Sequence, residues 1–128
     1  MVINKKNTLT LIMTTLVIIF LSSCEQKWKE GDLHGSWKLN SWTEINSDVS
    51  VGDKMDFTFE SGENKRYSID YGSMQEKGKY WIEYDYLVTV EDGSVAKKVK
   101  IISMSKDTLE FDMNRAGTLE RLVLSRVK

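Results

Sequence analysis

Short runs of alternating apolar and polar residues are the feature that most limits how this chain can fold. The alternation is clear in "KMDFTFES" at 54–61, in "KRYSIDY" at 65–71 and in "TLEFDM" at 108–113. A period of two places one face of a strand on a core and the other face in water. The chain has no proline, and no apolar stripe of helical spacing continues for three turns. The sequence therefore predicts an all-β fold.

Turn-forming residues separate these runs and set the number of strands. Gly, Asn, Asp and Ser gather in "SGENK", "YGSMQ", "EDGS", "SKD" and "NRAG", as expected for tight turns. In "KKVKIISMS" the alternation changes phase midway, which predicts a β-bulge near Ile101 and Ile102. Eight strands are expected, at 36–45, 54–61, 65–71, 76–83, 86–91, 95–104, 108–113 and 118–127.

The order of the strands favours one architecture. Eight short sequential strands joined by tight turns are typical of an antiparallel meander. One inward face per strand favours an eight-stranded up-and-down barrel, because closure leaves no exposed strand edge. A small β-sandwich is the alternative.

The first 23 residues differ from the rest of the chain. Lys5 and Lys6 precede an apolar run from Leu9 to Leu21, and small residues follow it. This is the pattern of a secretory signal peptide. The run is shorter than the roughly 20 residues that a membrane-spanning helix needs.

The end of this segment, Leu21-Ser22-Ser23-Cys24, resembles a bacterial lipobox. In a lipobox the signal peptidase cuts just before the cysteine, which carries acyl chains such as palmitate. The resemblance implies a signal peptide at 1–23, a lipidated tether at 24–34 and a barrel domain at 35–128. Acyl chains on Cys24 would make the membrane a partner without a transmembrane helix. The implied location is the bacterial outer membrane or, alternatively, the periplasmic face of the inner membrane.

The charge balance argues against a nucleic-acid partner. Removing Lys5 and Lys6 from the 18 basic residues leaves 16 against 19 acidic ones, a net charge of about −3 for the mature chain. The nearest approach to a basic patch is "KKVK" at 97–100, where Lys98 and Lys100 alternate with apolar residues. This spacing predicts a solvated strand face.

No motif in the chain predicts catalysis, a metal or a cofactor. His34 is the only histidine and Cys24 the only cysteine, so neither has the partners that a metal site needs. The acidic pairs fall at strand ends and turns, and neither a calcium loop nor a phosphate-binding loop is present. The protein is therefore expected not to be an enzyme, and to hold no metal or cofactor.

Gly35-Ser36-Trp37, after the short polar lead that ends in His34, resembles the G-x-W signature of lipocalins and other calycins. In that family an arginine near the end of the last strand lies across the motif tryptophan. The phrase "RLVLSRVK" supplies Arg126. "KGKYWIEYDYLVTV" and "IISMSKDTLEF" are also similar to small bacterial lipocalin-like lipoproteins. The resemblance implies a lipocalin-like barrel whose floor is formed by Gly35, Trp37 and Arg126.

Strand geometry favours Arg126 as the partner of Trp37. In a closed eight-stranded meander the last strand runs antiparallel to the first, so the end of one lies beside the start of the other. A guanidinium over an indole gains about 0.5–2 kcal/mol. Trp42 comes five residues after Trp37, so simple alternation places it on the outer face unless a bulge intervenes.

The residues expected to face inward could fill the core or line a pocket. The resemblance implies a small apolar ligand or lipid bound at the open end. The alternative is an envelope protein-interaction module, such as an inhibitor, immunity or assembly accessory protein, with a filled barrel. Exposed Trp42 and Trp81 would favour that module. The candidate ligand-lining residues are Phe57, Phe59, Tyr67, Tyr71, Tyr80, Phe111 and Met113.

Overall fold

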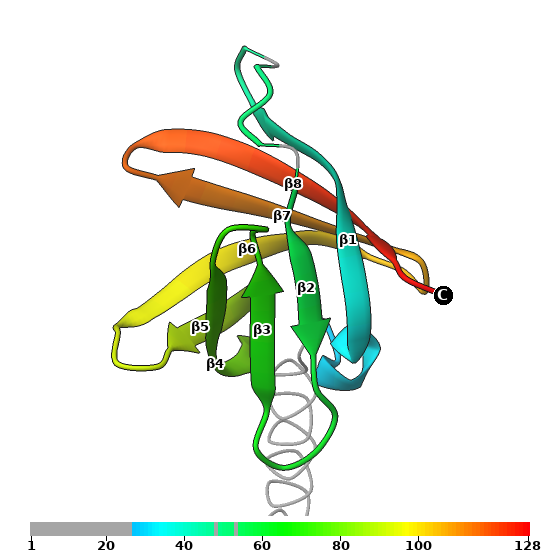
Figure 1. Cartoon of the computed structure of the whole chain (residues 1–128). Coiled ribbons are helices and arrows are strands. Elements are labelled where there is room, and N and C mark those ends of the chain that lie inside the picture. Colours follow the sequence, from blue (N-terminus) through cyan, green and yellow to red (C-terminus); the bar gives the residue numbers. More distant parts are fainter. Residues whose placement is uncertain (1–26, 48, 53) are drawn as a thin grey trace, which may run out of the picture.

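Eight strands form one closed antiparallel barrel in sequential order (Figure 1). The computed structural model describes residues 27–47, 49–52 and 54–128; the predicted signal peptide at 1–23 and Cys24 lie outside them. Within these ranges no helix is long and apolar enough to cross a membrane. The predicted barrel is confirmed, and the sandwich alternative is wrong because the sheet closes. The strands are β1 (Gly35–Glu44), β2 (Asp56–Phe59), β3 (Arg66–Asp70), β4 (Gln75–Glu83), β5 (Tyr86–Glu91), β6 (Ala96–Met104), β7 (Thr108–Arg115) and β8 (Thr118–Arg126).

The pairing of the first strand with the last closes the barrel. β8 runs antiparallel to β1, with Trp37 opposite Arg126 and Leu39 opposite Leu124. The end where β1 begins and β8 finishes is called the closed end below. The loop between β1 and β2 lies at the other end, called the open end, at the top of Figure 1.

A β-bulge in β6 lies where the sequence predicts one. The register of β6 on β7 shifts between Ile101 and Ser103, so Ile102 is the extra residue. Because of this extra residue, apolar side chains on both sides of the bulge point into the barrel, although the alternation changes phase in the sequence.

A second bulge in β1 changes the position of Trp42. The register of β1 on β8 shifts between Leu39 and Ser41, so Asn40 is the extra residue. Trp42 therefore lies on the inner face and packs against the core. The outer-face expectation from simple alternation is wrong, because the bulge moves every later residue of β1 to the opposite face.

Large side chains fill the closed half of the barrel. Trp37, Phe59 and Tyr80 are all essentially buried. The rings of Phe59 and Tyr80 meet edge to face with centroids 5.1 Å apart, and the ring of Phe57 lies 6.1 Å from that of Phe59. This aromatic packing supplies much of the buried apolar area.

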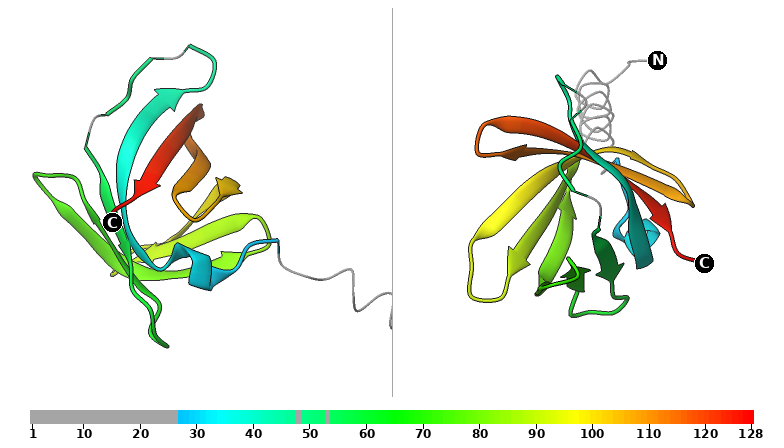
Figure 2. Two further views of the ribbon diagram at one scale, coloured as in Figure 1. Left: turned by 90° about the vertical axis from the view of Figure 1, so that its right-hand side faces the viewer. Right: turned by 45° about the horizontal axis from the view of Figure 1, so that its top comes forward.

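A 3₁₀ helix, η1 (Glu30–Leu33), lies under the closed end (Figure 2, left). Leu33 is fully buried, and Trp28 packs against the same core. The carboxylate of Glu30 accepts a hydrogen bond from the backbone N–H of Ile82 at 3.2 Å. The segment predicted as a tether is thus packed against the barrel from Trp28 onward.

Candidate functional site

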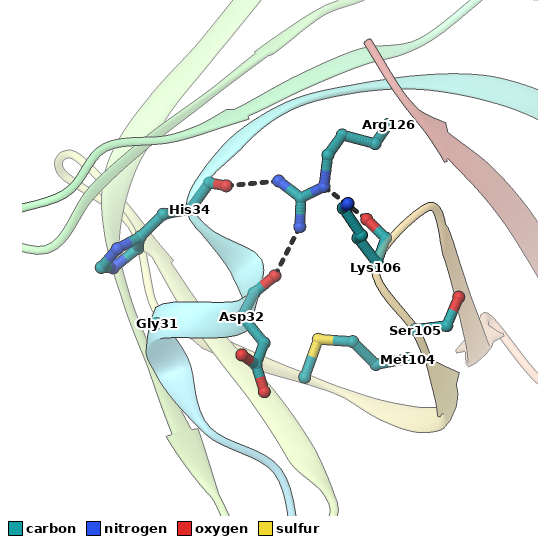
Figure 3. Close-up of a pocket in the computed structure, with 7 residues that line it drawn as sticks. All are labelled: Gly31, Asp32, His34, Met104, Ser105, Lys106 and Arg126. Atoms are coloured by element: carbon teal, nitrogen blue, oxygen red, sulfur yellow. Dashed lines mark hydrogen bonds between the residues drawn. The ribbon is translucent and has the colours of Figure 1, made fainter. Parts of the chain in front are cut away.

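Arg126 holds the closed end together through its guanidinium group. Its Cζ lies 4.1 Å from the centre of the Trp37 ring. Its Nε, Nη1 and Nη2 donate to the backbone carbonyls of Lys106, His34 and Asp32, at 2.6, 2.5 and 2.7 Å (Figure 3). Charge-assisted hydrogen bonds of this kind are among the stronger polar contacts in proteins.

Gly35 and Trp37 complete this end of the barrel. Gly35 has a φ of +120°, and a Cβ there would lie 2.8 Å from Nη1 of Arg126. Trp37 is fully buried, and its Nε1 donates to the carbonyl of Leu33 at 2.9 Å. The three residues form the floor of the barrel, and the side chain of Trp37 has no exposed surface.

An open hollow of about 500 Å³ lies on the outside of this floor. Figure 3 shows that the imidazole of His34 points away from the guanidinium of Arg126. No group of three or more His, Cys, Asp or Glu side chains that could hold a metal occurs in the part of the chain described. The hollow is lined by Gly31, Asp32, His34, Met104, Ser105, Lys106 and Arg126.

A second cavity, of about 440 Å³, lies at the open end. Five strands or their adjoining loops contribute to it, and both apolar and basic side chains form its wall. It is called the mouth cavity below. Its lining consists of Trp42, Met55, Tyr71, Lys97, Lys98, Val99, Met113, Asn114, Arg115 and Ala116.

The predicted ligand-lining residues divide between this cavity and the core. Tyr71 and Met113 line the mouth cavity. The others are almost fully buried below it and fill the barrel, with no more than 7% of any of them exposed: Phe57, Phe59, Tyr67, Tyr80 and Phe111.

A buried carboxylate lies next to the mouth cavity. Glu120 is 0% exposed. Arg115 donates to it from Nε at 2.9 Å and from Nη2 at 2.8 Å, and Trp42 Nε1 donates at 3.0 Å. The hydrogen bonds from Arg115 lower the pKa of Glu120 below its usual range, although burial acts in the opposite direction, and Trp42 adds to the lowering. Glu120 is therefore charged at neutral pH.

Glu76 and two tyrosine hydroxyls form a second polar cluster in the barrel. The hydroxyls of Tyr67 and Tyr71 donate to Glu76, at 2.7 and 3.3 Å. Burial, with the hydrogen bond to Glu76 second, raises the pKa of Tyr67 above its usual range. Burial and the charge of Glu76 raise the pKa of Tyr71 to about 12. Both hydroxyls stay protonated at neutral pH and serve Glu76 as donors.

Residues 33–111 match a family described as "Lipocalin-like domain". The chain belongs to this family. An eight-stranded barrel can be filled by its own side chains or can hold one small ligand. No curated protein sequence matches the chain.

Solved structures share the fold of this lipocalin-like domain. An uncharacterized protein from Bacteroides eggerthii DSM 20697 is 12% identical with a TM-score of 0.58, over 74% of this chain and 99% of that one. A lipocalin-like protein from Bacteroides uniformis ATCC 8492 is 15% identical with a TM-score of 0.57, over 76% of this chain and all of that one. At these identities the likeness concerns the fold alone.

Several residues of the mouth of this lipocalin-like domain were not predicted from the sequence. Trp42 was missed because nothing in "WKLNSW" marks the bulge at Asn40. Glu120 and Arg115 could have been found, since each falls in phase with the inward residues of its own strand. A charged residue in an inward position predicts a buried partner.

Proposed function

We propose that this lipocalin-like domain binds a small apolar or amphipathic molecule in the mouth cavity and releases it unchanged, without catalysis. The observation that carries the proposal is a cavity of about 440 Å³ above a filled core. Its apolar wall includes Trp42, Met55, Val99 and Met113. A concave apolar wall with a few polar groups is the usual composition of a small-molecule site.

The alternative, an envelope protein-interaction module, has less support. Exposure of Trp42 and Trp81 on the outer surface would favour such a module. Trp42 instead faces inward and packs on the core, and Trp81 is only partly exposed. The upper barrel is also hollow rather than filled.

The cavity can be tested by filling it. Val99→Trp adds an indole inside the mouth cavity, whereas Leu119→Trp adds the same group at a site that is 48% exposed. We expect Val99→Trp alone to abolish the fluorescence increase of the uncharged probe N-phenyl-1-naphthylamine. Circular dichroism would establish that both variants are folded. Equal probe binding by Val99→Trp and the unmodified chain would contradict the proposal.

We further propose that Cys24 carries lipid and holds the protein at the bacterial outer membrane, with the inner membrane as the alternative. Support comes from the sequence Leu21-Ser22-Ser23-Cys24, which follows an apolar run. Cys24→Ala should move the protein from the membrane fraction to the soluble fraction, while Ser22→Ala should not. Density-gradient separation of the two membranes would identify the one that holds it. Persistence of Cys24→Ala in the membrane fraction would contradict lipidation.

A further inference from the structure

The polar residues known to line the mouth cavity, within the described part of the chain, are neutral or basic. Among the residues that the structure describes, its lining contains Lys97, Lys98, Arg115 and Asn114 but no Asp or Glu. A ligand that enters the cavity would therefore meet cationic and neutral hydrogen-bond donors next to apolar side chains. Donors of this kind suit a negatively charged oxygen.

Two of these cations are available to a ligand. Lys98 is engaged on the outer face, where its Nζ lies 3.4 Å from Glu83. Lys97 lies on the opposite face of β6, in phase with inward-facing Val99, and makes no ion pair with any residue that the structure describes. Arg115 directs Nε and Nη2 at Glu120, which leaves its Nη1 group as a donor.

None of the Asp and Glu residues in the described ranges lines the cavity. Glu120 accepts hydrogen bonds from Arg115 and Trp42, and Glu76 accepts them from two tyrosines. Glu44 accepts a hydrogen bond from Ser47 at 2.8 Å. Glu91, the last residue of β5, is also absent from the lining.

We infer that the ligand of the mouth cavity is an anionic amphiphile, a molecule with one carboxylate-like head and an apolar tail. This inference rests on the proposed function and adds the charge of the ligand to it. Lys97 and Nη1 of Arg115 bind the head. Trp42, Met55 and Met113 contact the tail.

Three amphiphiles with the same tail separate the possibilities: decanoate, decan-1-ol and decyltrimethylammonium. The full chain would be held in lipid nanodiscs, with 5-fluorotryptophan in place of tryptophan. The ¹⁹F resonance of Trp42, assigned with Trp42→Phe, reports occupancy of the cavity and not partition into lipid. We expect decanoate to bind at least about tenfold more tightly than decan-1-ol, the ratio for one charge-assisted hydrogen bond.

Substitution of Lys97 tests the assignment of the head group. Lys97→Gln should reduce decanoate affinity severalfold and leave decan-1-ol affinity unchanged, whereas Lys100→Gln, on the outer face, should change neither. Equal binding of decanoate and decan-1-ol, or tighter binding of decyltrimethylammonium, would overturn the inference and leave the proposed function standing. No shift of Trp42 with any of the three would overturn both. An unchanged decanoate affinity in Lys97→Gln would overturn the role of Lys97.

Discussion

Trp42 joins the rim of the barrel to its interior through three contacts. Its Nε1 donates to Glu120, and its ring lies 5.6 Å from Cζ of Arg115. A Cβ on Gly52 would lie 2.7 Å from the same ring, so the loop between β1 and β2 rests on the indole. Trp42 thus contacts both the loop between β1 and β2 and the Arg115–Glu120 ion pair. It also forms part of the wall of the mouth cavity.

The buried carboxylate makes stability depend on pH. Because hydrogen bonding lowers the pKa of Glu120 in the folded state, its contribution is fully present above the unfolded pKa and is lost as pH falls through the folded value. Glu120→Gln should lower the free energy of unfolding by about 1–2 kcal/mol at pH 7, and by less below about pH 4.5. Urea unfolding at both pH values measures this.

A suitable control for that experiment is Glu83→Gln. Glu83 is 46% exposed and pairs with Lys98 at 3.4 Å, and exposed pairs contribute little. We expect no measurable change for this variant. A loss for Glu120→Gln that is equally large at acidic and neutral pH would show that the carboxylate is not charged in the fold.

At the scale of strands, two backbones approach each other where the barrel needs a glycine. Gly78 of β4 lies opposite Glu91 of β5, and a Cβ on Gly78 would lie 2.0 Å from the carbonyl oxygen of Val90. No side chain can occupy that position unless β5 moves. Gly78 therefore determines how tightly β4 and β5 pack.

Gly78→Ala should lower the free energy of unfolding by about 2 kcal/mol or more, because overpacking against backbone forces the strands apart. Gly31→Ala is the control, since a Cβ at Gly31 meets nothing within 4 Å. Thermal unfolding followed by circular dichroism compares the two. Equal stability of both variants would mean that β5 adjusts without cost.

The strands show what the sequence could reveal and what it could not. Alternation and turn residues predicted eight strands close to their observed bounds, and the phase change revealed the bulge near Ile102. The pairing of Trp37 with Arg126 was expected from the resemblance to lipocalins together with closure of the barrel. The bulge at Asn40 was invisible because Trp, Leu and Asn in "WKLNSW" suit either register. The difference between filled and hollow halves depends on side-chain packing in three dimensions, which a periodic pattern does not encode.

At the scale of the whole molecule, the barrel is packed at one end and hollow at the other. Trp37 and the aromatic residues above it fill the closed half, so a tail that enters the mouth cavity has a fixed depth available. Affinity for a series of alkyl carboxylates should rise about fourfold per added CH₂, as expected for about 0.8 kcal/mol each. The affinity should stop rising once the tail reaches the aromatic side chains that fill the closed half. A continuous rise across the series, measured by the Trp42 resonance, would show that the core opens.

The packing of Trp28 under the barrel has a consequence for how the barrel would be oriented on a membrane. Only three residues lie between Cys24 and Trp28, so the four steps along the chain span at most about 14 Å when fully extended. Trp28 and η1 belong to the closed end, and β1 carries the chain from there to the opposite end. With lipid on Cys24, the floor would therefore rest close to the bilayer and the mouth would face away from it. The protein would then exchange its ligand with the surrounding solution or with a soluble carrier, and not with the membrane leaflet that holds its lipid anchor.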